Sequence, residues 1–347
     1  KHLDKEELYE NTEQFLKEKA VYHTMLSVAE DVSSGKVDTS DVLDKFEKSC
    51  NINLVTDLGL DLYSNIDTLI DDINSVEHHI PSKWEWLDDC LGGGFLEAGK
   101  SLYVFAGETN IGKSIFLGNV AHNIAKEGKN VLLITLEMSE LLYARRICSN
   151  VTKVPMKEMV GNTPAIEQAI KDEKGKIFIK EFPPASITVN QLKGFIKKFQ
   201  EQGIKLDAIV LDYLNLMHST IGNNSYERIK HVTEQVRAMS YLFECPIISA
   251  TQLNRAGFDQ DNPDLATISE SIGLAATADV IVSVYQNEED RELGIIRLGM
   301  MKNRYGPRGS TQAMRINYST LSIEEADDIE FEDDGNETLN ILAGLAS

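Results

Sequence analysis

Apolar and polar positions alternate along the middle of the chain in a pattern typical of strands that each lead into a helix. Apolar runs at residues 101–106, 131–136 and 208–211 have the length of buried strands. Residues 115–126 and 189–202 carry apolar side chains at helical spacing instead. Because strands that alternate with helices form a parallel sheet covered on both faces, we predict an α/β fold with a mainly parallel central sheet.

The N-terminal part of the chain has a different pattern. Apolar positions form helical stripes over residues 4–30, 38–46 and 62–73, and polar stretches separate the three segments. Helices this short bury little apolar surface by themselves. We therefore predict a small helical N-terminal and linker region over residues 1–79, which docks on a larger surface such as a neighbouring copy of the chain.

The pattern changes again towards the C-terminus. Residues 295–301 and 310–316 bracket Pro307 and Gly309, which predicts a β-hairpin. After Arg315 the chain contains acidic residues but no Lys or Arg. We therefore predict that a globular domain over residues 80–320 is followed by an acidic disordered tail, 321–347. The tail either competes with an anionic ligand for basic loops, binds a basic partner, or only keeps the protein in solution.

Composition narrows the classes of function. The 347 residues are 42% hydrophobic and carry a formal net charge of −21, so any polyanion must be held by local basic loops. The four cysteines have no C-x-x-C spacing, which indicates neither zinc nor disulfides. The chain shows no apolar stretch of membrane-spanning length and no signal-peptide core, so we expect a cytoplasmic protein without a membrane partner.

One octapeptide matches the P-loop template G-x-x-x-x-G-K-[ST], and it follows the strand at residues 101–106 and precedes the helix at 115–126. It reads Gly107-Glu108-Thr109-Asn110-Ile111-Gly112-Lys113-Ser114. In this arrangement backbone N–H groups surround the phosphates, Lys113 reaches the β- and γ-oxygens, and the Ser114 hydroxyl ligates Mg²⁺. We predict a P-loop NTPase that uses ATP or another NTP with Mg²⁺.

Hydrolysis also needs a carboxylate near the metal and a group that orients water. Asp212 ends an apolar strand in the Walker B pattern, so we assign its carboxylate to the Mg²⁺ shell. Glu137 ends the strand after the P-loop helix and is our candidate general base, although a solvent-facing turn residue would read the same way. Gln252 follows a strand and is placed to sense the γ-phosphate; the alternative is a surface glutamine.

Several short motifs occur in one order. They are Leu136-Glu137-Met138, Asp212-Tyr213-Leu214, Gln252-Leu253-Asn254-Arg255, Ala278-Asp279, and Lys302-Asn303-Arg304-Tyr305-Gly306-Pro307-Arg308-Gly309. This set, over about residues 80–317, resembles the DnaB-like replicative DNA helicases. The segment at residues 268–279 is most similar to their bacteriophage branch.

The resemblance implies a RecA-like core that works as a homo-hexameric ring. Such a ring hydrolyses NTP between subunits and moves 5′ to 3′ along single-stranded DNA while it unwinds the duplex. It also implies that Glu137 is the catalytic glutamate, Gln252 the phosphate sensor, and Arg304 with Lys302 the basic pair inserted into a neighbour's site. A cation supplied in this way stabilises charge on the transferred phosphoryl group.

Two loops are candidates for DNA contact. The loop after Asp212 contains Asn224, Arg228 and Lys230, and the loop after Gln252 contains Arg255. In the family that the chain resembles, the corresponding loops line the central channel and hold phosphates, whereas without that context each would read as a solvated polar loop. The resemblance names primase, a helicase loader and a single-strand-binding protein as further candidate partners. A phage-encoded chain would act in the host cytoplasm.

Two other functions fit the same residues. A RecA-type recombinase would bind DNA as a filament and use ATP mainly as a switch. A loader or scaffold would hold nucleotide without hydrolysing it. The Lys302-Asn303-Arg304 segment favours the ring helicase over the recombinase, and the presence of Glu137, Asp212 and Gln252 argues against the scaffold.

Overall fold

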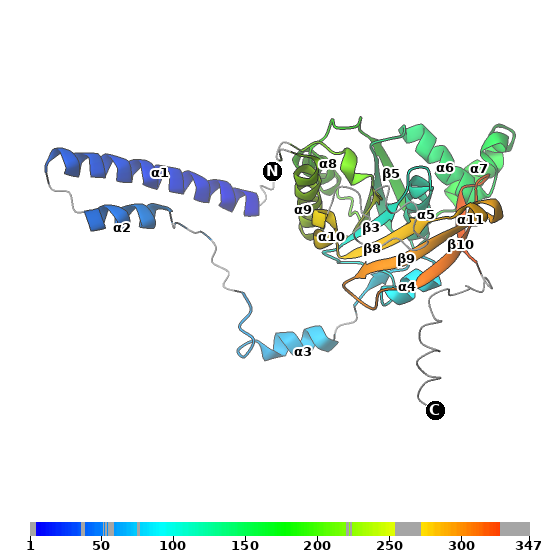
Figure 1. Cartoon of the computed structure of the whole chain (residues 1–347), viewed down its shortest axis with the longest axis horizontal. Helices are drawn as coiled ribbons and strands as arrows, with labels where there is room; N and C mark the ends of the chain where they lie inside the picture. The colour runs from blue at the N-terminus through cyan, green and yellow to red at the C-terminus, as the bar shows by residue number, and fades with distance from the viewer. Residues whose placement is uncertain are drawn as a thin grey trace, which may run out of the picture. The chain divides into compact units, whose positions relative to one another are not determined.

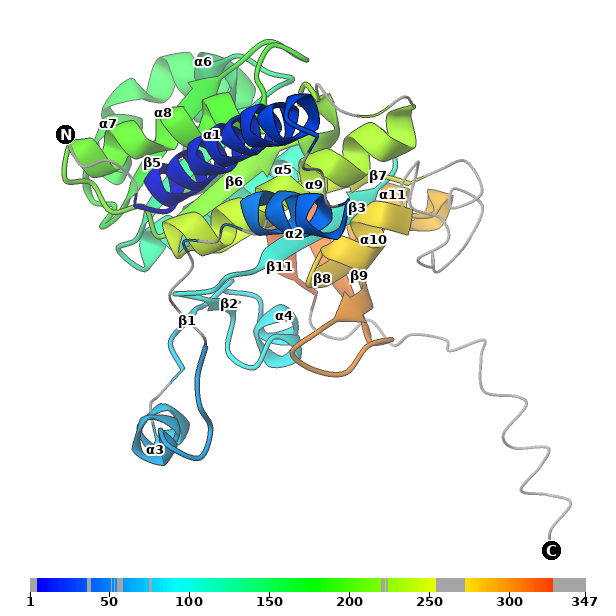
Figure 2. The same cartoon turned by 90° about the vertical axis from the view of Figure 1, so that its left-hand side faces the viewer.

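The computed structural model describes residues 5–35, 39–50, 52, 54, 59–74, 77–219, 222, 224–253 and 272–326. The chain divides into two compact units, Lys1–Val76 and Glu77–Ser347. Figures 1 and 2 show their elements from two directions. Among the described residues no helix combines the length and the apolar character needed to cross a bilayer.

The first unit contains α1 (Lys5–Ser33), α2 (Thr39–Cys50) and α3 (Ile66–Asn74). Helices α1 and α2 lie side by side (Figure 1), joined by a hydrogen bond of 2.6 Å between the Thr24 and Ser49 hydroxyls and an ion pair of 3.1 Å between Lys45 and Asp31. Large apolar side chains stay about half exposed on this unit, for example Phe15 at 55%. The polar contacts therefore hold the helix pair together while much of its apolar surface remains available to another surface.

The second unit contains the predicted α/β fold. Up to the P-loop helix, its elements in chain order are β1 (His79–Ile80), α4 (Glu85–Cys90), β2 (Phe95–Leu96), β3 (Leu102–Gly107) and α5 (Lys113–Lys126). The middle of the unit contains β4 (Asn130–Thr135), α6 (Glu140–Thr152), the 3₁₀ helix η1 (Met156–Asn162), α7 (Thr163–Lys171), β5 (Lys176–Glu181), α8 (Val189–Glu201), β6 (Ala208–Asp212), the 3₁₀ helix η2 (Leu214–Leu216), α9 (Ser225–Phe243) and β7 (Ile247–Gln252). The last part contains α10 (Ile272–Thr277), β8 (Val280–Tyr285), α11 (Glu288–Leu293), β9 (Ile295–Asn303), β10 (Thr311–Asn317) and β11 (Ser322–Glu325).

Nine strands form one sheet in the order β11-β10-β9-β8-β3-β7-β6-β4-β5. The strands from β8 to β5 in that order run parallel, and β9, β10 and β11 add antiparallel pairs at one edge. This arrangement confirms the mainly parallel sheet and the hairpin of β9 and β10 that the sequence predicts. The first short pair, β1 with β2, forms a separate antiparallel sheet.

Alternate residues of β3 pack into two cores, one on each face of the sheet. Tyr103 and Phe105 face the cluster that contains Phe116 of α5, where the Phe105 and Phe116 rings lie 4.4 Å apart. Leu102 and Val104 face the cluster that contains residues of α8 and α9. Because strand side chains alternate between faces, an all-apolar strand such as β3 must be covered on both sides, and the helices provide that cover.

The start of the predicted acidic tail is wrong. Residues 322–325 form β11, which pairs with β10 and buries Ile323 to 4% exposure. The Ile323 carbonyl accepts a hydrogen bond of 3.2 Å from the Trp84 indole, and its N–H donates to Asn119 at 3.0 Å. One apolar residue among many acidic ones gives little sequence signal, although these long-range contacts fix it in the core. The rest of the tail, from residue 327, lies outside the described residues.

Candidate nucleotide-binding site

The carboxyl ends of four adjacent strands bring the predicted catalytic groups together. In the register of the sheet, Gly107 of β3 lies beside Gln252 of β7, and Thr135 of β4 lies beside Asp212 of β6. Glu137 follows Thr135 by two residues. Since β3, β7, β6 and β4 are consecutive neighbours and all parallel, the P-loop, Gln252, Asp212 and Glu137 emerge at the same edge of the sheet, where open α/β sheets bind ligands.

The P-loop connects β3 to α5 by a backbone that needs small residues. Gly112 has a φ of 97°, a conformation that L side chains rarely adopt, and α5 begins at the next residue. A Cβ on Gly107 would lie 2.7 Å from the Val284 carbonyl oxygen. Ile111 is buried at 3% exposure and packs the loop onto the core. The free N–H groups at the start of α5 therefore point at the space enclosed by the loop.

Lys113 lies across that space. Its ammonium group donates hydrogen bonds to the carbonyl oxygen of Gly107, at 3.0 Å, and to that of Glu108. Burial lowers the pKa of Lys113 to about 8, and the nearby negative charges of Asp212 and Glu137 oppose this shift. A cation held by two carbonyl oxygens in a partly desolvated site can exchange them for phosphate oxygens, which bind it more strongly because they are charged.

Asp212 has the surroundings expected of a metal ligand. Its side chain is 1% exposed, and its Oδ2 has no hydrogen-bond partner among the described residues. The pKa of the carboxyl group is raised to about 6, chiefly by burial and also by the charge of Glu137, while the Ser114 and Tyr143 hydroxyls and Lys113 oppose the shift. A buried, unpaired carboxylate oxygen is unusual in proteins, and a cation beside it would supply the missing partner.

Ser114 and Asp212 together fit Mg²⁺ rather than a metal held by the protein alone. Within the described parts of the chain, no group of three or more His, Cys, Asp or Glu side chains could hold a metal ion. Magnesium usually takes one or two protein oxygens and completes its shell with phosphates and water. The donor set, one hydroxyl and one carboxylate beside a P-loop, is of this kind.

Glu137 differs from Asp212 in exposure. It lies exposed in a tight turn in which the Thr135 hydroxyl oxygen accepts a hydrogen bond of 3.0 Å from the Met138 N–H. Its charge nevertheless raises the pKa of Asp212, so the two carboxylates act on the same space. Gln252 lies on the other side of Asp212, where its amide donates to the Tyr213 hydroxyl at 3.4 Å. An exposed and a buried carboxylate at one site suit two different roles, one towards water and one towards metal.

Lys302 and Arg304 lie at the amino ends of the parallel strands, opposite to the ends that hold the P-loop. Arg304 forms an ion pair of 2.7 Å with Asp279, and Asp279 also accepts a hydrogen bond of 3.0 Å from the N–H of Leu102, the first residue of β3. The P-loop begins at the last residue of the same strand, about 17 Å away at 3.3 Å per residue. Lys302 donates to the Ala275 carbonyl oxygen at 2.7 Å. These two basic residues therefore lie away from the P-loop of their own chain.

Sequence reasoning missed two residues that organise these ends. Arg237 of α9 binds both carboxylate oxygens of Asp279, at 2.9 and 3.0 Å, so Asp279 stays paired whatever Arg304 does. Tyr143 of α6 is fully buried and donates to the Ser114 carbonyl oxygen at 2.9 Å, which holds the start of α5. A single Arg or Tyr in a helix carries no local signal. The motif Ala278-Asp279 was the one sequence feature that pointed to the contact between Arg237 and Asp279.

The predicted DNA contacts are brought together only in part. Asn224 caps α9 by accepting a hydrogen bond of 2.8 Å from the Glu227 N–H. Arg228 donates to the Gly222 carbonyl oxygen at 3.3 Å, and Lys230 lies 3.8 Å from Glu234. The structure thus places these three side chains on the first turns of α9, after the carboxyl end of β6. Arg255 lies outside the described residues.

The chain is similar to known proteins over most of its length. A family described as "DnaB-like helicase C terminal domain" matches residues 79–321. The chain is 24% identical to the DnaB-like replicative helicase of Enterobacteria phage T4 over 97% of this chain and 75% of that protein. It is 26% identical to the replicative DNA helicase DnaB of Geobacillus stearothermophilus over 74% of this chain and 59% of that protein.

Solved structures show the same fold. A DnaB-like replicative helicase, solved to show its interactions with primase, superposes with a TM-score of 0.65 at 18% identity, covering 92% of this chain and 78% of that one. An ATPase domain superposes with a TM-score of 0.67 at 20% identity, covering 78% of this chain and all, 100%, of that one. At these identities the likeness establishes the fold. The mixed sheet with its covering helices is thus a known architecture.

Proposed function

The chain belongs to the DnaB-like helicase C terminal domain family, and from this membership and the site we propose that it is the motor of a replicative DNA helicase. The motor hydrolyses ATP and pulls itself along single-stranded DNA, 5′ to 3′, which separates the duplex ahead of it. It works in the cytoplasm, which is the host cytoplasm if a phage encodes it.

The observation that carries this proposal is the separation of the two halves of the catalytic machinery. The carboxyl ends of the parallel strands hold Lys113, Asp212, Glu137 and Gln252. The amino ends of the same strands hold Arg304 and Lys302. A closed site needs both halves, so a second copy must present its basic end to the first copy's P-loop. Head-to-tail contacts of this kind generate a ring when the rotation closes, and we propose the homo-hexamer of the family.

Each residue then has one role at the shared site. The P-loop N–H groups and Lys113 hold the phosphates, and Ser114 with Asp212 holds Mg²⁺, which neutralises charge on the phosphate oxygens when it is bound. Glu137 orients the attacking water and accepts its proton, and Gln252 contacts the γ-phosphate. Arg304 and Lys302 of the neighbouring copy stabilise the negative charge that develops on the transferred phosphoryl group.

The geometry favours the ring motor over a scaffold, and the family membership favours it over a recombinase. A nucleotide-holding scaffold has no need for an exposed glutamate close enough to a buried aspartate to raise its pKa, as Glu137 is. A recombinase filament also shares sites between copies, so the family membership, rather than the geometry, favours the helicase over the recombinase. The description of one structural relative mentions its interactions with primase, and we propose primase as a partner here, with a loader and a single-strand-binding protein as further candidates.

Unwinding polarity tests the proposed function. We expect the protein with ATP and Mg²⁺ to separate a forked duplex that has a free 5′ single-stranded arm and to leave a duplex with only a 3′ arm intact. The measurement is strand separation followed by a fluorophore and quencher pair, with a non-hydrolysable ATP analogue as the control. Separation of neither substrate, while ATP is hydrolysed, would contradict the helicase assignment.

The first turns of α9 are the part of the DNA interface that can be tested directly. We expect the double variant Arg228→Ala, Lys230→Ala to bind poly-dT more weakly and to keep its basal ATPase. Because each single-strand phosphate contact contributes about 0.7 to the slope of log K against log salt, the loss of two contacts should make the slope shallower by about 1.4. An unchanged slope, measured by fluorescence anisotropy over a salt series, would place the DNA elsewhere.

A further inference from the structure

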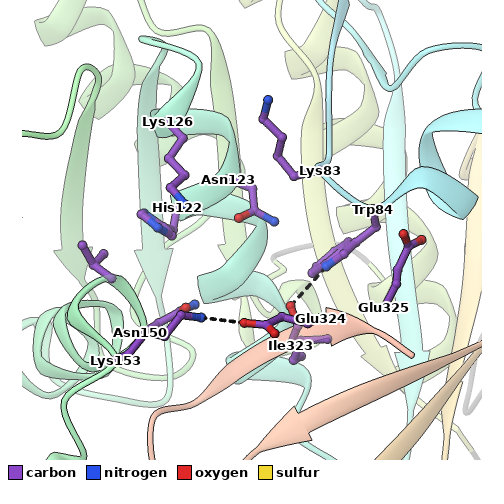
Figure 3. Close-up of a pocket in the computed structure, with 11 residues that line it drawn as sticks. Lys83, Trp84, His122, Asn123, Lys126, Asn150, Lys153, Ile323, Glu324 and Glu325 are labelled. Carbon is purple, nitrogen blue, oxygen red and sulfur yellow. Dashed lines mark hydrogen bonds and ion pairs between the residues drawn. The ribbon is translucent and has the colours of Figure 1, made fainter. Parts of the chain in front are cut away.

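A pocket of about 240 Å³ lies away from the P-loop, beside the C-terminal half of α5. Side chains from three other parts of the second unit complete it: the segment before α4, the end of α6, and β11 (Figure 3). Its charged lining includes Lys83, Lys126, Lys153, Glu324 and Glu325. None of the catalytic roles proposed above uses these residues.

The two carboxylates at this pocket already have partners. Glu324 forms an ion pair of 2.9 Å with Lys153, and Glu325 accepts a hydrogen bond of 2.8 Å from the Trp86 N–H. Lys83 pairs with Glu127 at the other side of the pocket. Among the described residues, Lys126 has no ion pair or hydrogen bond, so its ammonium group is open to a ligand. Glu325 keeps its negative charge, because its hydrogen-bond partner is a neutral N–H.

His122 is the second group without a partner. It precedes Lys126 by one helical turn, so both side chains lie on the same face of α5, and both line the pocket. Its side chain is 4% exposed and makes no hydrogen bond within the described residues. Burial, with the charges of Lys126 and Lys153, lowers the pKa of His122 to about 4, so the ring is neutral at pH 7 and carries one N–H donor. The ring nitrogens are not fully enclosed, so a ligand in the pocket can reach them.

We propose that this pocket binds an anionic oxygen group, a carboxylate or a phosphate, through the ammonium group of Lys126 and the imidazole of His122. Lys153 and Lys83 each pair with one carboxylate and have further N–H donors that can reach the ligand. Charge-assisted hydrogen bonds from such donors are the strong class in proteins. The bound anion would satisfy both unpartnered groups at once.

Two sources of this chemistry are available. One is free phosphate or a phosphate ester in solution. The other is the acidic sequence that follows Ala326, which begins Asp327-Asp328. Glu325 itself lines the pocket, and Asp328 follows it by three positions in the sequence, a span of at most about 11 Å.

Trp84 provides a reporter inside the pocket. It lines the pocket at 2% exposure and donates to the Ile323 carbonyl oxygen at 3.2 Å. The chain contains 2 tryptophans, so Trp86→Phe leaves Trp84 as the single emitter. The Trp86 indole N–H is buried without a partner among the described residues, so its removal costs no hydrogen bond. Adding Lys113→Ala removes phosphate binding at the P-loop from the signal.

The experiment titrates this Trp86→Phe, Lys113→Ala full chain with inorganic phosphate, with sodium chloride at matched ionic strength as the blank. We expect a saturable change in Trp84 fluorescence. Lys126→Gln should weaken phosphate binding by about tenfold or more, since it removes a charged hydrogen bond. His122→Asn should weaken it as well. Lys174→Gln, an exposed lysine that does not line this pocket, should leave the affinity unchanged.

Deletion of residues 327–347 identifies the source of the anion. Phosphate binding that becomes about tenfold tighter after the deletion would show that the acidic sequence occupies the pocket in the full chain. Equal affinity would assign the pocket to free phosphate. No saturable change in either protein, or equal losses in Lys126→Gln and Lys174→Gln, would overturn the proposal. The outcome does not depend on the helicase assignment, since no step uses hydrolysis or DNA.

Discussion

Replacement of Glu137 by Gln is expected to lower the kcat for ATP hydrolysis by about 10²- to 10⁴-fold, which is the usual contribution of a general base. Nucleotide affinity should change little, because in the proposed mechanism Glu137 acts on water, whereas Lys113 and the P-loop N–H groups hold the phosphates. The measurement pairs steady-state ATPase with the Kd for a fluorescent ATP analogue. An effect on kcat alone is the signature of an interaction made in the transition state.

Two variants serve as controls for this result. Lys113→Ala should lose nucleotide binding itself, because its ammonium group lies in the phosphate space. Glu140→Gln removes a carboxylate three residues after Glu137 that pairs with Lys180 at 2.7 Å, and hydrolysis should be retained. Wild-type ATPase in Glu137→Gln would remove this residue from its role, and an equal loss in Glu140→Gln would point to a general defect of the turn.

Replacement of Arg304 by Ala should lower ATP hydrolysis by about 10³- to 10⁵-fold, the range for a cation supplied across an interface. The fold should survive, because Arg237 still holds both oxygens of the buried Asp279. Arg308→Ala is a matched control: Arg308 is exposed in the same turn, and within the described residues it has no ion pair or hydrogen bond. We expect it to keep most of the activity.

Mixing shows whether Arg304 acts on another copy. Arg304→Ala spoils the basic side of an interface, and Lys113→Ala spoils the P-loop side, so some interfaces in a mixed ring contain an intact pair. We expect ATPase to recover partly at intermediate mixing ratios, although each variant alone is inactive. No recovery at any ratio, when native mass spectrometry shows that mixed rings form, would mean that both residues serve the same copy.

The side chains at the carboxyl ends of the parallel strands were predictable, because the position of each at the end of a strand depends on local sequence. The P-loop, Asp212, Glu137 and Gln252 each follow an apolar run, and the carboxyl ends of parallel strands meet at one edge. Their relative positions then follow from the strand order, in which β3, β7, β6 and β4 are neighbours. The fold class was predictable for the same reason, since the apolar periods alternate between strand and helix.

The contacts between distant segments were not predictable in this way. Asp279 binds Arg237 and Arg304 from different elements, and Tyr143 binds the backbone of Ser114 from across a helix pair. Such pairings depend on tertiary packing, which a window of sequence does not contain. β11 was missed because Ile323 is followed by acidic residues, whereas its pairing with β10 and its contacts with Trp84 and Asn119 place it in the core.

The most direct test of the motor assignment is the ATPase rate with and without poly-dT, at saturating ATP and Mg²⁺. A motor that steps along single-stranded DNA couples binding of the strand to hydrolysis, so we predict that poly-dT raises kcat by about tenfold or more, a change of about 1.4 kcal/mol in the barrier. The increase should saturate with poly-dT and disappear in Arg304→Ala. Equal rates with and without poly-dT, in protein that forms rings and binds the strand, would contradict the account.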